Sequence, residues 1–174
     1  ATPEEIKIEV KILSDSLEAG AAGLSMGLVY AHEVNADVTE LLAVTKTAAA
    51  KNALLSAHLR SEGGHVGAAL DEMIGLATTA KARLKISHFK IQAQENWKYL
   101  EPALGAIERA YHAGLDICFD VYPYTTSWSV LYTYLPKWAY EGGKKWILRN
   151  LQDKEARSRI LAHLESQPSL GQIF

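Results

Sequence analysis

Four short apolar runs recur along this chain at intervals of about 31 residues, and this repeat restricts the possible folds more than any other feature. Such an interval is the length of one strand, one loop and one helix. The runs cover residues 22–26, 53–57, 83–87 and 115–119. Because strands that are joined by helical crossovers pair in parallel, the sequence predicts an α/β fold with a parallel sheet.

Helix signals occupy the segments between these runs. Thr2, Pro3 and Glu5 supply an N-cap, a proline in the first turn and an acidic side chain near the start of a helix that is expected to continue to Gly20. Further helices are predicted from residue 39, over 65–81 and over 96–113. The alternation of strands and helices is typical of βα units.

After the fourth run no fifth strand is predicted, and the character of the sequence changes. Residues 128–174 contain two helix-like stretches, at 144–151 and 154–165, and we interpret them as a helical insertion. A closed (β/α)8 barrel needs about 250 residues. We therefore expect residues 1–127 to form part of a TIM-type barrel with four strand-helix units. A small open, doubly wound sheet is the alternative.

Composition excludes several functional classes. Hydrophobic residues make up 48% of the 174 residues and charged residues 22%, which is ordinary for a globular domain. A net charge of -2 gives no reason to expect nucleic acid or an acidic membrane as partner. One cysteine cannot form an internal disulfide, and no segment is long and apolar enough to span a membrane. We expect a cytoplasmic protein.

Two histidines mark a candidate metal site. His58 and His88 end the second and third apolar runs, and the polar residues Arg60, Glu62 and Lys90 follow them. The carboxyl ends of parallel strands open at one edge of a sheet, and neighbouring backbones lie roughly 5 Å apart. Neutral imidazoles are good ligands for Zn²⁺. The sequence therefore predicts that His58 and His88 bind one zinc ion, which would also need a third ligand and a water.

Structural roles are open for the same residues. A histidine at a strand end can be a hydrogen-bonded structural residue, and Arg60 and Lys90 can be solvated loop charges. Glu62 can pair with Arg60 or cap the following helix. Cys118 is expected to be a small buried hydrophobe, and Phe119 is expected to face the helices. Solvent exposure is expected for the remaining histidines, His32, His65, His112 and His163.

Four ordered motifs resemble the D-aminoacylases, the N-acyl-D-amino-acid deacylase branch of the amidohydrolase superfamily. The motifs are Gly-Ala-Ala-Gly-Leu-Ser-Met-Gly-Leu-Val-Tyr at 20–30, Ala-His-Leu-Arg-Ser-Glu at 57–62, Ile-Ser-His-Phe-Lys at 86–90 and Asp-Val-Tyr-Pro-Tyr at 120–124. Segments after the last motif, at 135–138, 141–143 and 151–157, are also similar to that family.

The resemblance implies a metal-dependent (β/α)8 barrel that hydrolyses the amide bond of N-acyl-D-amino acids. The four strands would be barrel strands four to seven, and His58 and His88 would be the histidine ligands of strands five and six. Lys90, helped by Arg60, would hold the substrate carboxylate by charge-assisted hydrogen bonds. The other residues that the resemblance places at the substrate are Tyr30, Tyr122, Tyr124 and Ser127.

Parts of that family's catalytic centre have no counterpart in this chain. The paired histidines of strand one, the cysteine ligand of an earlier strand and the aspartate general base of strand eight are absent. The resemblance thus implies a catalytically incomplete central piece. One alternative is a non-catalytic half-barrel that binds a ligand and oligomerises through its open edges, so the partner is either a second copy or the rest of a barrel. Another is an amidohydrolase that acts on cyclic amides.

Overall fold

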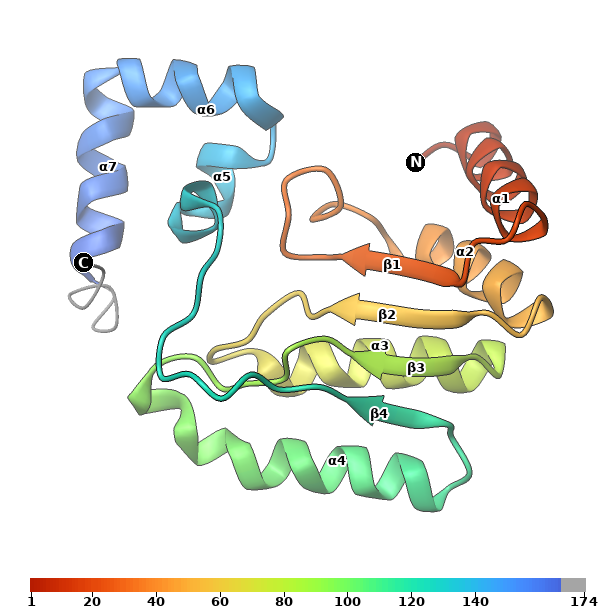
Figure 1. The fold of residues 1–174 in the computed structure, drawn as a ribbon. Coiled ribbons are helices and arrows are strands. Elements are labelled where there is room, and N and C mark those ends of the chain that lie inside the picture. Colours follow the sequence, from red (N-terminus) through yellow and green to blue (C-terminus); the bar gives the residue numbers. More distant parts are fainter. Residues whose placement is uncertain (167–174) are drawn as a thin grey trace. The chain divides into compact units, whose positions relative to one another are not determined.

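The computed structural model describes residues 1–166 and shows helices packed on a parallel sheet (Figure 1). Among these residues, four strands form one sheet in the order β1-β2-β3-β4, and neighbouring strands are parallel. The strands are β1 (Gly23–Gly27), β2 (Leu54–His58), β3 (Arg83–Ile86) and β4 (Ile117–Phe119). The predicted α/β fold with a parallel sheet is confirmed, and each strand overlaps the apolar run that predicted it.

The helices before and between the strands also agree with the sequence pattern. They are α1 (Pro3–Glu18), α2 (Val38–Ala50), α3 (Val66–Ala80) and α4 (Leu100–His112). The Thr2 hydroxyl accepts the Glu5 N–H at 3.3 Å, and the Glu5 carboxylate accepts the Thr2 N–H at 2.6 Å, which is a capping box at the start of α1. A 3₁₀-helix, η1 (Gln94–Tyr99), precedes α4, so the α-helix starts four residues later than predicted.

The chain divides into two compact units. The first contains residues 1–28 and 36–122, and the second contains residues 29–35 and the described residues from 123 to 166. The second unit carries η2 (Leu131–Tyr134), α5 (Lys137–Tyr140), α6 (Gly143–Gln152) and α7 (Lys154–Glu165). Helices α6 and α7 confirm the two helix-like stretches of the tail. The domain boundary after residue 127 stays a prediction.

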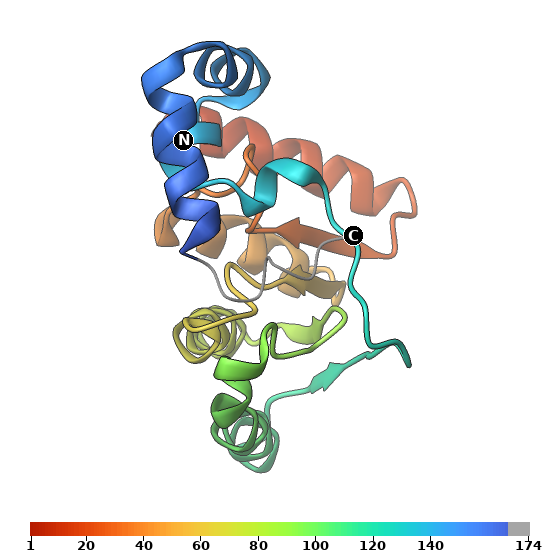
Figure 2. The same cartoon turned by 90° about the vertical axis from the view of Figure 1, so that its left-hand side faces the viewer.

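Alternate strand residues form the core of the first unit. Leu55, Ala57 and Ile86 are fully buried and belong to one cluster with Met73 of α3. Lys85, which lies between core residues of β3, keeps part of its surface exposed. Figure 2 shows α3 and α4 on the same side of the strands. The helices therefore pack on the face that presents the apolar side chains, and the histidine-bearing face is the more polar one.

Burial along β4 differs from the prediction. Cys118 is exposed, because alternation directs it away from the face on which Ile117 is buried. Phe119 is 40% exposed, although its ring centroid lies 5.2 Å from that of Phe89. In the described sheet β4 pairs with β3 alone, so its side chains have neighbours on one side. Exposure is confirmed for three of the remaining histidines, His32, His65 and His112, whereas His163 is half-buried.

Gly23 lies where β1 approaches β2 too closely for a side chain. It is in register with Leu54, and a Cβ at this position would lie 2.2 Å from the Leu54 carbonyl oxygen. Because that oxygen belongs to the backbone of the sheet, the two strands would have to move apart. We expect Gly23→Ala to lower the free energy of unfolding by about 2–3 kcal/mol in urea titrations.

A glycine in open space provides the control for this substitution. A Cβ at Gly75 of α3 meets nothing within 4 Å, so Gly75→Ala should be neutral or stabilise the protein by up to about 1 kcal/mol. Equal effects of the two substitutions would contradict the close approach of β1 and β2.

Within residues 1–166, no helix combines the length and the apolar character that crossing a membrane requires.

Candidate metal centre

The parallel register brings His58 and His88 to the same edge of the sheet. His58 is the last residue of β2, and its carbonyl oxygen accepts the Leu28 N–H at 3.2 Å. His88 follows β3 by two residues, and the intervening Ser87 donates its N–H to the Ala57 carbonyl at 2.9 Å. Backbone hydrogen bonding therefore continues past the strand ends. It fixes the backbone positions from which both histidine side chains project.

The two imidazole rings face each other. Nδ1 of His58 lies 2.5 Å from Nε2 of His88, and the ring planes are inclined by 49°. A tetrahedral zinc ion, with Zn–N distances of about 2.0–2.1 Å, keeps two ligand nitrogens about 3.3 Å apart. The rings would thus have to separate by roughly 0.8 Å, which small side-chain rotations can supply. The two nitrogens fit two positions of a zinc centre.

The described residues do not complete a zinc centre. In residues 1–166, no group of three or more histidine, cysteine, aspartate and glutamate side chains is arranged to hold a metal ion. A catalytic zinc site normally has three protein ligands and an open position for water. The donor set therefore fits part of a zinc centre and not all of it.

The surroundings of His58 favour its neutral form. Burial lowers the pKa of His58, the neighbouring His88 lowers that pKa further, and Glu62 opposes both effects. A neutral imidazole keeps a lone pair that can bind a metal ion. Near neutral pH, His58 is accordingly in the form that a metal ligand requires.

His88 is held in a left-handed backbone conformation. Its φ is +39°, a value that residues other than glycine rarely adopt. The His88 N–H donates to a carboxylate oxygen of Asp120, whose other oxygen lies 2.5 Å from Nζ of Lys85. The Lys85 ammonium and then the His88 N–H hold the pKa of the Asp120 carboxyl below its usual range. The charged Asp120 thereby supports the backbone from which the His88 ring projects.

Glu62 connects His88 with Lys90. Its Oε1 lies 3.0 Å from Nδ1 of His88 and 2.7 Å from Nζ of Lys90. Lys90 also donates to the His88 carbonyl at 3.2 Å, and its Nζ lies 5.5 Å from the ring centroid of Tyr122. Sequence reasoning gave Glu62 a structural role, either as partner of Arg60 or as a helix cap. The structure shows neither contact and places Glu62 beside the predicted ligand His88.

Arg60 instead contacts α3. Its Nε and Nη2 donate to the two carboxylate oxygens of Glu72 at 3.0 and 2.9 Å, and Nη2 also donates to the Ala36 carbonyl at 3.2 Å. A bidentate ion pair of this kind fixes the orientation of a guanidinium group. A substrate carboxylate would have to compete with Glu72, and the predicted role of Arg60 in substrate binding stays a prediction.

The predicted substrate contacts are divided between the two units. Tyr122 belongs to the first unit, where its ring centroid lies 6.4 Å from that of His88. Tyr30, Tyr124 and Ser127 belong to the second unit. Within that unit, Tyr30 stacks on His32 with ring planes inclined by 5°, and Tyr124 is 74% exposed. The roles of Tyr30, Tyr122, Tyr124 and Ser127 in substrate binding stay predictions.

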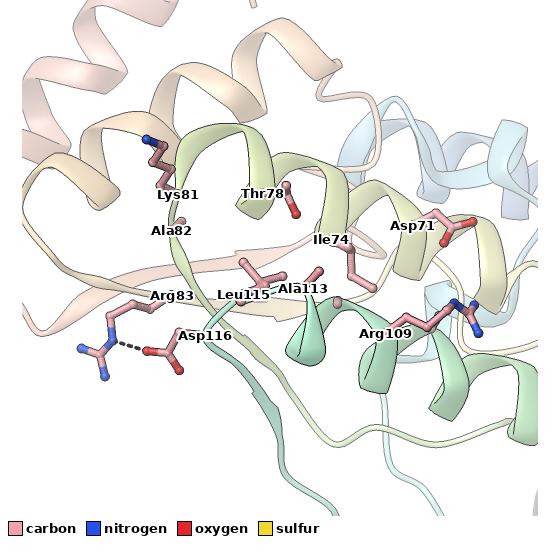
Figure 3. A pocket seen from close by; sticks show the side chains of 13 residues that line it. Asp71, Ile74, Thr78, Lys81, Ala82, Arg83, Arg109, Ala113, Leu115 and Asp116 are labelled. Atoms are coloured by element: carbon pink, nitrogen blue, oxygen red, sulfur yellow. Dashed lines mark hydrogen bonds and ion pairs between the residues drawn. The ribbon is translucent and has the colours of Figure 1, made fainter.

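A separate cavity of about 660 Å³ lies between α3 and α4 (Figure 3). Arg83, at the start of β3, and Asp116, just before β4, lie on its wall and form an ion pair at 2.9 Å. Its lining contains no histidine or cysteine. Chemistry in parallel α/β folds takes place at the carboxyl ends of the strands, whereas this cavity lies at the amino ends. We therefore place the candidate site at the histidines.

Comparison with known sequences identifies relatives of this chain. No family model matches it. It is 39% identical over 121 residues to N-acyl-D-glutamate deacylase of Alcaligenes xylosoxydans xylosoxydans, a match that covers 70% of this chain and 25% of the relative. It is 31% identical over 131 residues to the D-aminoacylase of the same organism, over 75% of this chain and 27% of the relative.

Solved structures agree with these sequence matches. N-acyl-D-glutamate deacylase from Bordetella bronchiseptica, complexed with zinc and a phosphonate inhibitor, matches with a TM-score of 0.70 and 32% identity, over 71% of this chain and 26% of that one. A D-aminoacylase structure matches with a TM-score of 0.68 and 31% identity, also over 71% and 26%. This chain spans about a quarter of the length of these relatives.

This chain thus has a parallel α/β fold with paired histidines at the carboxyl edge of its sheet, and it is similar to amidohydrolase structures. Within that class, the matched part of the chain is homologous to the N-acyl-D-amino-acid deacylases, which include the D-aminoacylases.

Proposed function

We propose that this chain supplies part of the metal centre of an N-acyl-D-amino-acid deacylase, with His58 and His88 as two zinc ligands. The observation that carries the proposal is the convergence of the two ring nitrogens, 2.5 Å apart, at the carboxyl edge of the sheet. The homologous N-acyl-D-glutamate deacylase is complexed with zinc and with a mimic of the tetrahedral intermediate. A homologous D-aminoacylase has a binuclear metal centre.

The sheet itself supports a place in a barrel. Its strands follow one another in the order β1-β2-β3-β4. A doubly wound sheet reverses its strand order at a switch point, whereas a barrel keeps the order of the chain. In our proposal the four strands are strands four to seven of a (β/α)8 barrel.

The residues around the histidines have distinct proposed roles. A bound zinc ion lowers the pKa of a bound water toward about 7 and polarises the amide carbonyl. The Lys90 ammonium, held by Glu62, would bind the carboxylate of the D-amino acid and so fix which face of the amide is attacked. Arg60 would assist Lys90 if the substrate displaced Glu72. The aromatic and hydroxyl groups proposed to contact the substrate are those of Tyr30, Tyr122, Tyr124 and Ser127.

A centre with two histidine ligands and no general base should not turn over substrate. We expect the 174-residue chain, supplied with Zn²⁺, to release D-glutamate from N-acetyl-D-glutamate no faster than buffer that contains the same zinc. Release of the free D-amino acid can be followed by chiral chromatography. The complete deacylase of Alcaligenes serves as the positive control.

Metal-dependent turnover well above the buffer rate would contradict the incomplete centre. Loss of that turnover in His58→Ala would then show that the described histidines suffice together with residues that we have not assigned.

A further inference from the structure

We propose that Glu62 is a positioning residue that fixes the tautomer of His88. Its carboxylate accepts a hydrogen bond from the protonated Nδ1 of His88, so that Nε2 directs its lone pair toward His58. Glu62 is not one of the two proposed zinc ligands, and its effect on the metal rests on the proposed function. Its effect on the His88 tautomer requires no metal.

The carboxylate of Glu62 can act only as an acceptor when ionised. Its Oε1 lies 3.0 Å from Nδ1 of His88, and the Glu62 side chain is 18% exposed. If Nδ1 carried no proton, its lone pair would face a negative oxygen at that distance with little water between them. A proton on Nδ1 converts this repulsion into a charge-assisted hydrogen bond.

Lys90 is the neighbour that could favour the opposite tautomer, since its Nζ lies 3.0 Å from the same Nδ1. An ammonium group has three donors, and Lys90 has two other acceptors, Oε1 of Glu62 at 2.7 Å and the His88 carbonyl at 3.2 Å. Lys90 therefore satisfies its charge without Nδ1. The Glu62 oxygen that accepts from Lys90 has a second lone pair, and it can also accept the proton of Nδ1 at 3.0 Å. The arrangement favours the Nδ1–H form of His88.

The backbone holds Glu62 in place for this role. The Glu62 carbonyl accepts the Gln92 N–H at 2.6 Å, which ties the loop after β2 to the loop after β3. The loop that carries His88 is held from its other side by Asp120. The carboxylate and the imidazole are therefore placed by hydrogen bonds that do not depend on the contact between them.

The tautomer of His88 also determines which of the two histidine rings donates the hydrogen bond between them when no metal is bound. If Nε2 of His88 is an acceptor, Nδ1 of His58 must donate across the 2.5 Å contact. To hold a metal ion at this position, His58 would need the lone pair of Nδ1, so its neutral ring would carry the proton on Nε2 instead. His88 keeps its tautomer throughout, because Glu62 fixes it. Second-sphere carboxylates of this kind orient ligating histidines in many metal sites.

The test is the ¹⁵N chemical shift of the His88 ring nitrogens in the metal-free chain, at about pH 8, above the ordinary pKa of histidine. We expect a protonated Nδ1 and an unprotonated Nε2 in the unmodified protein. In Glu62→Gln, whose amide can either accept or donate, and in Glu62→Ala, the fraction of the Nε2–H tautomer should increase. The opposite tautomer in the unmodified protein, or His88 shifts that neither substitution changes, would overturn the proposal.

Two matched variants distinguish the effect of Glu62 on the His88 tautomer from a general effect of removing a carboxylate and from an effect of Lys90. Glu72→Gln removes a carboxylate of similar exposure that pairs with Arg60, and it should leave the His88 shifts unchanged. Lys90→Met should also leave the Nδ1–H form in place. A tautomer that changes in Lys90→Met and persists in both Glu62 variants would assign the control to Lys90 and refute the proposal.

Zinc affinity then connects the tautomer with the metal. Glu62→Ala should weaken zinc binding about 10–100-fold in competition with a chromophoric chelator. A tautomer that shifts as expected, together with zinc affinity that is unaffected by His58→Ala, would contradict the proposed metal centre and leave the role of Glu62 toward His88 intact. Unchanged zinc affinity in Glu62→Ala, with His58→Ala impaired, would overturn the positioning role and leave the metal centre standing.

Discussion

Replacing His58 by alanine in the 174-residue chain should weaken zinc binding by more than about 100-fold, and His88→Ala should do the same. Each substitution removes one of two nitrogens that lie 2.5 Å apart and converge on one position. Loss of a residue that only orients a ligand already costs about 10–100-fold in affinity, so the loss of the ligand itself should cost more. The measurement is zinc titration in competition with a chromophoric chelator, with metal content checked by elemental analysis.

His112→Ala is the matched control, because His112 is exposed at the end of α4. It should leave zinc affinity unchanged. Equal affinity in all three variants would show that zinc binds elsewhere and would contradict the proposed centre. A stable dimer with negligible zinc, observed by light scattering together with metal analysis, would favour the half-barrel that oligomerises and binds a ligand without catalysis.

The fold could be predicted from the sequence because the spacing of the apolar runs agrees with the helix start and end signals along most of the first unit. Each of the first three apolar runs is followed by a segment with helical spacing, and Thr2 and Gly20 mark the ends of the helix that precedes the first run. Parallel pairing followed from the length of the connections. The 3₁₀ stretch before α4 was not predicted, because the side-chain pattern of a short 3₁₀ segment differs little from that of an α-helical turn.

Burial at β4 could not be predicted from the sequence. Alternation gives the relative direction of neighbouring side chains, but the extent of their burial depends on what packs against each face. Ile117 is buried, whereas Cys118 and Phe119 are exposed in a strand that pairs on one side. The type of a residue predicts its burial only when its neighbours are known.

The candidate site was predictable as a pair of histidines and not as a hydrogen-bonded network. Spacing placed His58 and His88 at neighbouring strand ends, and the structure brings their rings into contact. The sequence also left open that Glu62 pairs with Arg60 or caps the following helix. The strand ends at His58, however, so alternation no longer determines directions beyond it, and Arg60 and Glu62 contact different elements.

Leu55→Ala should be among the most destabilising substitutions in the chain, with a loss of about 3–5 kcal/mol in the free energy of unfolding. Leu55 is fully buried in β2 and packs in the cluster that joins the sheet to α3, so its truncation leaves a cavity that the surrounding helices cannot close. The preceding residue, Leu54, is the matched control: it is half-buried and faces the opposite side of the same strand. Leu54→Ala should cost less than about half as much in urea unfolding, because less apolar surface is lost from the interior. Equal costs at the two positions would mean that both faces of β2 are covered alike, and the face that bears His58 would then have no room for a metal ion and its substrate.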